Sequence, residues 1–309
     1  MNPEYGINKR QVSKAFNRAA ARYDQVAVLQ RMVGEQLLER LELVKLSPAV
    51  VVDVGAGTGL QTIDLLRRYG KAQVMALDLA PEMLHEARRR VKGRALERVL
   101  EAVWPRRHCH FVCGDTECLP FANQSVDLIF SNLTLQWCSA LDSVFTEFRR
   151  ILKPGGLLTF TTLGPDTLKE LRAAWSSADA YRHVNPFVDM HDIGDGLVRA
   201  GLAEPVMDVE HYTFTYPDVY GLMRDLKLLG AQTVGSGRQA GLMGKNRRQK
   251  MMQSYEAFRE GGRLPASFEV VYGHAWGVEQ TLQQRTADGA IQIPLHALKG
   301  RSKPIGNRS

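Results

Sequence analysis

The sequence predicts an α/β fold in which a mostly parallel sheet carries helices on both faces. Short apolar stretches that suit buried strands alternate with amphipathic helical stretches, and this alternation builds parallel sheets. A glycine-rich turn, Gly55-Ala56-Gly57-Thr58-Gly59, follows the first strand candidate. Polar residues follow later strand candidates, at the sheet edge where open α/β sheets bind ligands. The chain has 309 residues, enough for one such domain with an added segment.

The first strand is expected at Val50–Val54, because Val-Val-Val-Asp-Val is β-branched and almost continuously apolar. Glycines in the turn after it permit backbone angles closed to other residues and let a ligand approach the main chain. The helix expected at 60–69 begins with free N–H groups, which suit a polar or anionic ligand. An ordinary tight turn is the alternative interpretation. The candidate ligand residues here are Asp53, Gly55, Ala56, Gly57 and Gly59.

The second strand, expected at 73–77, is followed at once by Asp78. An acidic residue about 20 positions beyond such a glycine turn can accept hydrogen bonds from both ribose hydroxyls of a nucleotide-like cofactor. The third glycine of the turn comes one position too early for the dinucleotide fingerprint, which favours a different cofactor. A solvated Asp at a strand end is the alternative.

Strand and helix candidates continue through the rest of the chain. Further strands are expected at 110–112, 126–131, 157–163, 207–215 and 268–276, and further helices from 81 and at 141–152, 167–175, 191–200, 218–230 and 247–259. The predicted parts are N-terminal helices (1–48), a core (49–216), a helical lid insertion (217–265), a last core strand (266–279) and a tail (280–309) that we expect to be disordered. A lid in this place would cover the ligand edge of the sheet.

Polar residues after the third and fourth strands complete a cofactor site at that edge. Asp115 and Thr116 follow the third strand, and a carboxylate suits an adenine amino group because it accepts hydrogen bonds. Asn132 and Leu133 follow the fourth strand, where main-chain carbonyls can bind an ammonium group. Leu79 and Met83 are expected to sandwich the adenine ring. Gln30 and Tyr23, from the N-terminal helices, are expected to face the cleft.

These motifs resemble those of the class I S-adenosylmethionine (SAM) methyltransferases. The segments concerned are 53–59, 76–78, 114–115, 119–121, 125–129 and 152–156. Other segments are similar, more narrowly, to the malonyl-[acyl-carrier protein] O-methyltransferase family of biotin synthesis: 16–20, 23–24, 29–30, 132–137, 162–165, 168–171, 185–187 and 223–231. The resemblance covers residues 8–277 and implies a seven-stranded Rossmann-like sheet with N-terminal helices and a helical lid.

The resemblance implies transfer of the methyl group of SAM to the free carboxylate of malonyl-[acyl-carrier protein]. That carboxylate is already ionised at pH 7, so no general base is required. Arg and Lys recognise carboxylates best, and Arg224 and Lys227 share a helix face at i and i+3. A solvated basic face is the alternative for this pair. Tyr23 and Trp137 are candidate walls of the transfer pocket, or ordinary core aromatics.

The net charge of +7 is concentrated in two segments, at 88–107 and 238–263. Because acyl carrier proteins are acidic, basic residues within the predicted lid favour a docking surface for the carrier protein. A solvated basic surface is the alternative. No aromatic-interleaved motif accompanies the charges, so nucleic acid is not expected as the partner. The densest docking candidates are Lys245, Arg247, Arg248 and Lys250.

No apolar run approaches the ~18 residues of a membrane span, and residues 1–6 lack an apolar signal core, so we expect no membrane partner and a cytoplasmic location. The four cysteines, at 109, 113, 118 and 138, lack the spacing of a zinc site, so no metal is expected.

Two other functions stay open. One is methylation of another small acid, a quinone precursor or an RNA; the other is a non-methylating role, as in a related assembly factor of the hydroxylase type.

Overall fold

The computed structural model describes residues 6–92, 109–231, 245–279, 284–285 and 291–292. Of the basic segment at 88–107, residues 93–107 lie outside this description, as does most of the tail after 280. Within the tail, β8 (Gln284–Arg285) pairs antiparallel with β9 (Ile291–Gln292). No helix in the described part of the chain is long and apolar enough to cross a membrane.

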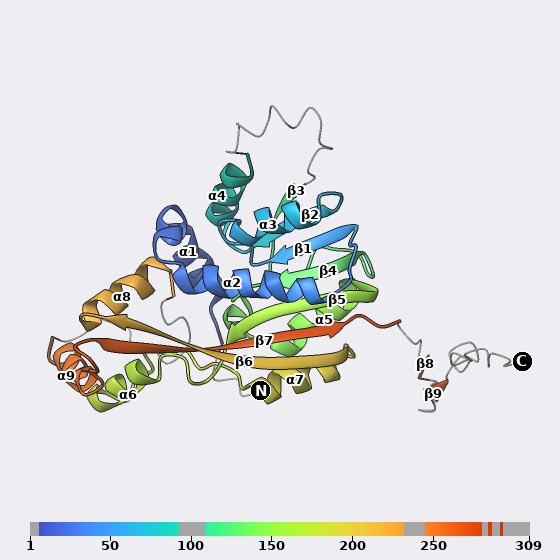
Figure 1. Cartoon of the computed structure of the whole chain (residues 1–309). Helices are drawn as coiled ribbons and strands as arrows, with labels where there is room; N and C mark the ends of the chain where they lie inside the picture. Colours follow the sequence, from blue (N-terminus) through green and yellow to red (C-terminus); the bar gives the residue numbers. More distant parts are fainter. Residues whose placement is uncertain (1–5, 93–108, 232–244, 280–283, 286–290, 293–309) are drawn as a thin grey trace, which may run out of the picture.

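A seven-stranded sheet forms the centre of the molecule, in the order β3-β2-β1-β4-β5-β7-β6 (Figure 1). The first five strands run parallel, and β7 is antiparallel to both β5 and β6. This is the α/β class that the sequence predicts. The strands are β1 (Val50–Val54), β2 (Gln73–Asp78), β3 (Cys109–Cys113), β4 (Val126–Ser131), β5 (Leu152–Leu163), β6 (Ala203–Tyr216) and β7 (Leu264–Trp276).

Helices cover both faces of this sheet because alternate strand residues point to opposite sides. Val51 and Phe130 pack on one face with residues of α2 and α3, whereas Val52 and Ile129 pack on the other with residues of α5 and α7. Figure 1 shows α2 lying across the first of these faces. The helices are α1 (Lys9–Ala19), α2 (Val28–Arg40), α3 (Leu60–Arg68), α4 (Pro81–Lys92), α5 (Leu141–Ile151), α6 (Lys169–Ala178) and α7 (Met190–Arg199).

Two further helices, α8 (Val219–Leu228) and α9 (Lys245–Glu256), lie between β6 and β7, as the helical insertion predicted from the sequence requires. Helix α9 packs against α6. The turn after α8 approaches α1, since a Cβ atom on Gly230 would lie 3.3 Å from the main chain of Ala15. The insertion and the N-terminal helices therefore meet on one side of the sheet. Movement of the insertion as a lid stays a prediction.

Candidate active site

The glycine turn lies at the carboxyl edge of β1 and is held by packing as well as by backbone geometry. Gly55 and Gly59 have φ values of +73° and +78°. A Cβ atom on Gly55 would collide with Thr134, and one on Gly59 would lie 2.8 Å from the Cβ of Ala87 in α4. Around Gly57, by contrast, the nearest atom to an added Cβ is 4.0 Å away. Of the three glycines, Gly57 is therefore the one that borders open space.

Asp78, at the end of β2, points its carboxylate at this turn. Its Oδ2 accepts a hydrogen bond from the main-chain N–H of Gly57 at 2.9 Å, and its Oδ1 accepts one from Ala80 at 2.8 Å. Burial raises the pKa of Asp78 to about 6, and these main-chain hydrogen bonds oppose the shift. Each carboxylate oxygen has a second lone pair, so the group can still accept from the hydroxyls of a ligand.

Asp53 has a different place from the one expected. It is 2% exposed beneath the turn, and its Oδ2 accepts a hydrogen bond from Thr62 Oγ1 at 2.5 Å, which ties β1 to α3. Asp53 does not line the cavity of about 80 Å³ that lies above the turn, and neither do Ala56 and Gly59. The contact of these three residues with a cofactor stays a prediction. Burial, and to a smaller extent Asp78, raises the pKa of Asp53 to about 7.

The raised pKa of Asp53 predicts that the ligand-free protein loses stability as pH rises. The folded state holds the proton to about pH 7, whereas an unfolded Asp releases it near pH 3.9. The stabilising contribution is thus complete below about pH 4 and is lost as pH rises through 7, at up to about 1.4 kcal/mol per pH unit. The raised pKa of Asp78 likewise lowers the stability of the folded protein as pH rises to about 6.

Denaturant unfolding between pH 4.5 and 7.5 checks this prediction, with the Asp53→Asn variant compared against wild type. The free energy of unfolding of the variant should depend less on pH than that of wild type, because the Asn side chain cannot release a proton. The exposed Asp192→Asn variant is the matched control and should keep the wild-type slope. Identical slopes for wild type and Asp53→Asn would contradict a raised pKa at Asp53.

A cavity of about 80 Å³ lies above the turn and gathers nine of the thirteen predicted cofactor residues. They come from the ends of β1 to β4 and the start of α4, because the carboxyl ends of parallel strands meet at one edge. Helix α1 covers this cavity with Lys9, Val12 and Phe16. The nine residues are Gly55, Gly57, Asp78, Leu79, Met83, Asp115, Thr116, Asn132 and Leu133.

Lys9 is a site residue that no sequence signal indicated. Its ammonium forms ion pairs with Asp115 and with Glu117, the latter at 2.9 Å. These contacts hold α1 over the cavity, assisted by the Ser13 hydroxyl, which donates to the main-chain oxygen of Leu79 at 3.0 Å. A lysine near the start of a helix is ordinary in sequence, so only the tertiary arrangement distinguishes it.

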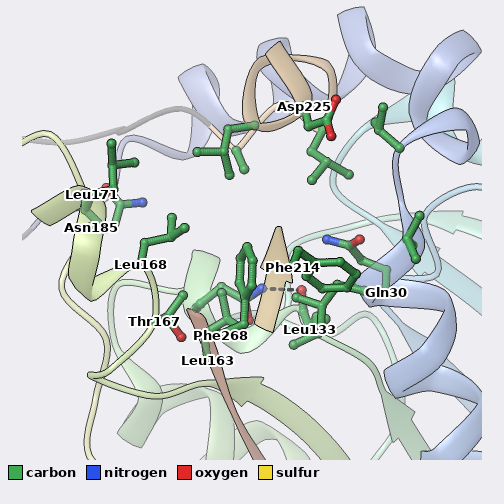
Figure 2. A pocket seen from close by; sticks show the side chains of 18 of the residues that line it. Gln30, Leu133, Leu163, Thr167, Leu168, Leu171, Asn185, Phe214, Asp225 and Phe268 are labelled. Atoms are coloured by element: carbon green, nitrogen blue, oxygen red, sulfur yellow. Dashed lines mark hydrogen bonds between the residues drawn. The ribbon is translucent and has the colours of Figure 1, made fainter. Parts of the chain in front are cut away.

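A larger cavity of about 370 Å³ adjoins the first and has mostly apolar walls (Figure 2). The walls include residues of α2, α6, α8, β5, β6 and β7 and of the loops between them, with Leu163, Leu168, Phe214 and Phe268 among them. Gln30 belongs to this cavity, not to the smaller one in which it was predicted. Its side-chain oxygen is buried without a hydrogen-bond partner in the structure. Gln30 thus adds one unpaired polar atom to the wall of a mostly apolar cavity.

Four side chains line both cavities and separate one from the other: Phe16, Tyr23, Leu133 and Trp137. The ring of Phe16 stands edge-on to Trp137, with centroids 5.2 Å apart, and lies 6.3 Å from the ring of Tyr23. Tyr23 and Trp137, predicted as walls of the transfer pocket, thus line both cavities, and their part in methyl transfer stays a prediction. Burial and the nearby carboxylates of Asp78 and Asp24 raise the pKa of Tyr23, so its hydroxyl stays protonated and can donate a hydrogen bond.

Asp24 holds the neighbouring backbone of Tyr23 against the glycine turn. Its Oδ1 accepts a hydrogen bond from Thr58 Oγ1 at 2.6 Å, and its Oδ2 pairs with Arg90 of α4. Arg90 also donates to the main-chain oxygen of Thr58 at 2.9 Å. The tyrosine between the cavities is therefore anchored to the two elements that carry the cofactor residues.

The structure corrects the prediction for Arg224 and Lys227. Both are exposed, and neither lines the larger cavity. Helix α8 instead turns Asp225 and Leu226 towards that space, and Figure 2 shows Asp225 on this wall. The rotation of α8 follows from burial of its apolar stripe, which includes Leu222 at 1% exposure. The described lining of the larger cavity contains no Lys or Arg.

Comparison with known proteins agrees with this geometry. Residues 52–160 match the family described as "Methyltransferase domain". A malonyl-[acyl-carrier protein] O-methyltransferase of Nitrosospira multiformis is 52% identical, over 89% of this chain and 91% of that protein. One of Laribacter hongkongensis is 47% identical, over 96% and 98%.

Among solved structures, the YcgJ protein of Bacillus subtilis has the same fold. Its TM-score is 0.55 at 16% identity, over 79% of this chain and 99% of that one. This likeness supports the fold alone, whereas the relatives above extend over nearly the whole chain. The chain therefore belongs to the malonyl-[acyl-carrier protein] O-methyltransferase family.

Proposed function

We propose that this protein transfers the methyl group of SAM to the free carboxylate of malonyl-[acyl-carrier protein], forming the methyl ester used in biotin synthesis. The observation that carries the proposal is the contact between two unlike cavities. One contains the acceptors that suit a nucleoside, and the other is apolar and suits an acyl chain. Methyl donor and acceptor would meet at the four side chains that the cavities share.

The smaller cavity offers a suitable partner to each part of SAM. Asp78 would accept from the ribose hydroxyls, Asp115 from the adenine amino group, and the apolar side chains of Leu79 and Met83 would contact the ring. The cofactor residues at Asn132 and Leu133 are proposed for the methionyl end. When bound, SAM supplies a methyl group activated by a positively charged sulfur.

The residues of this chain act by positioning and by excluding water. The attacking carboxylate is ionised at neutral pH and needs no base. The Tyr23 hydroxyl, kept protonated by its surroundings, would donate a hydrogen bond to that carboxylate. A neutral donor orients the group and leaves its negative charge available for attack. Phe16 and Trp137 would keep water from the reacting atoms.

A labelling assay tests the proposed reaction. Purified protein is mixed with SAM labelled in its methyl group and with malonyl-carrier protein. Label should pass to the carrier protein as an ester that mild base releases. Acetyl-carrier protein, which has no free carboxylate, is the matched control and should stay unlabelled. Transfer to RNA or to a free small acid, with none to the malonyl thioester, would contradict the proposal.

For the carrier protein we propose docking beside α9, at the residues predicted from the sequence. The guanidinium group of Arg248 lies 5.6 Å from the ring centre of Tyr220, and that of Arg247 lies 5.6 Å from the ring centre of Tyr181. Lys250 is exposed. The side chain of Lys245 is not part of what the structure describes. Arginines held over aromatic rings on a surface suit an acidic partner.

Reversal of this charge should weaken binding of the carrier protein. Changing Arg247, Arg248 and Lys250 together to Glu is expected to raise KM for malonyl-carrier protein about fivefold, with kcat and SAM affinity unchanged. Higher salt should bring the wild-type KM towards that of the variant. Steady-state kinetics at two ionic strengths measure both effects.

The matched control reverses the same number of charges at the end of α4, where Arg88, Arg89 and Lys92 are exposed. Arg90 is left unchanged there because it holds Asp24. A rise in KM from this control and none from the α9 variant would move the docking surface to α4.

A further inference from the structure

A third hollow, of about 540 Å³, lies on the surface between α6 and the loop that follows it. It shares four residues with the larger cavity: His183, Val184, Asn185 and Phe187. The two spaces therefore adjoin along this loop. In Figure 2, Asn185 lies on the opposite side of the cavity from Gln30 and from Leu133, which is one of the four side chains shared with the smaller cavity. The surface hollow, here called the α6 groove, thus adjoins the larger cavity at its far side.

Rigid polar groups stand at the junction of the α6 groove and the larger cavity. The His183 ring stacks on Trp175 with centroids 3.7 Å apart, and its Nε2 lies 2.8 Å from Asp179 Oδ1. Asp179 also accepts from the main-chain N–H of Tyr181 at 2.9 Å. The imidazole is thereby fixed in place, and Asn185, two positions further along the chain, lines both spaces as well. These groups can form hydrogen bonds with amides that pass through the junction.

The α6 groove also has basic side chains in its lining. Arg172 and Arg182 line it, and both residues are exposed to solvent. Arg172 donates to the main-chain oxygen of Thr167 at 2.8 Å, which limits its movement. The one carboxylate in the described lining, that of Asp179, is engaged by His183 and lies 3.9 Å from Arg247 of α9. The groove therefore opens beside the α9 surface proposed for docking.

We propose that the α6 groove and the larger cavity together bind the phosphopantetheine arm of the carrier protein, a deepening that rests on the proposed function. The arm carries a phosphodiester at its protein end, two amides in its middle and the thioester at its tip. Arginines suit the phosphodiester because a guanidinium can donate two parallel hydrogen bonds to phosphate oxygens. Each group of the arm has a suitable partner: the exposed Arg172 and Arg182 for the phosphodiester, His183 and Asn185 at the junction for the amides, and the apolar walls of the larger cavity for the acyl end.

Two small thioesters that differ only in the phosphate test this assignment on the full-length protein. Malonyl-4′-phosphopantetheine should have a KM about tenfold lower than malonyl-pantetheine with wild-type protein, as expected for a charged hydrogen-bonded contact. The double variant Arg172→Gln, Arg182→Gln should lose this preference by raising KM for the phosphorylated thioester alone. Its unfolding temperature and SAM affinity report whether the fold is kept.

The matched control is Arg224→Gln with Lys227→Gln, which removes the same charge from the exposed face of α8 and should preserve the preference. Equal KM values for the two thioesters with wild-type protein would overturn the phosphate site. So would an equal loss on both thioesters in the double variant. If these results appear while malonyl-carrier protein is still methylated, the proposed function stands and the groove assignment fails. If no malonyl thioester is methylated, both fail.

Discussion

Replacement of Tyr23 by Phe is expected to lower kcat/KM for malonyl-carrier protein about thirtyfold, since a hydrogen bond to a charged group contributes about 1.5–3 kcal/mol. The ring stays in place between the two cavities, where it packs beside Phe16, and only the hydroxyl is lost. The substrate carboxylate should still enter the cavity but should be poorly oriented there. The loss should therefore appear in kcat. SAM affinity should change less than about threefold, because Phe16 and Trp137 still wall the smaller cavity.

Rapid-quench measurement of a single turnover, beside calorimetry with SAM, separates orientation from binding. Tyr69→Phe is the control, because Tyr69 follows α3 and lines neither cavity. It should behave as wild type. A Tyr23→Phe variant that turns over at the wild-type rate would remove the hydroxyl from the mechanism and leave Tyr23 as a wall.

Replacement of Asp78 by Ala should weaken SAM binding about a hundredfold, as expected for two lost hydrogen bonds of about 1.5 kcal/mol each. The variant also loses the acceptor that holds the N–H groups of Gly57 and Ala80. Isothermal calorimetry measures the affinity directly. The control is Asp192→Ala on the exposed part of α7, which should bind SAM normally. An unchanged affinity in a folded Asp78→Ala protein would contradict the ribose assignment.

The pKa of Asp78 adds a pH dependence to the same experiment. Burial raises this pKa to about 6 in the free protein, and hydroxyl donors favour the ionised carboxylate. SAM affinity should therefore increase as pH rises through 6, by up to tenfold between pH 5 and 7. The Asp78→Asn variant has no such titration and should bind weakly at every pH. A wild-type affinity that stays level across this range would argue against a protonated Asp78 in the free protein.

Local sequence patterns were sufficient for the framework of the site. The apolar run of β1, the glycine turn and Asp78 after β2 each have a local cause, in β-branched residues, positive φ angles and strand length. Parallel strands then bring their carboxyl ends to one edge whatever the details of packing. For this reason the sequence predicted which residues gather in the smaller cavity with few errors.

Tertiary packing decided which way each of the remaining side chains points. A spacing of i and i+3 puts Arg224 and Lys227 on one helix face, but the burial of Leu222 and the packing of the half-buried Leu226 against the core turned that face to solvent. Gln30 lines the larger cavity because α2 lies across the sheet there, and Asp53 is buried and ties β1 to α3 through Thr62. Lys9 over Asp115, and the junction at His183 and Asn185, join segments distant in sequence. The sequence by itself thus determined the sheet, its ligand edge and the family, whereas helix rotation and long-range contacts, which depend on the whole core, decided the shape of the substrate side.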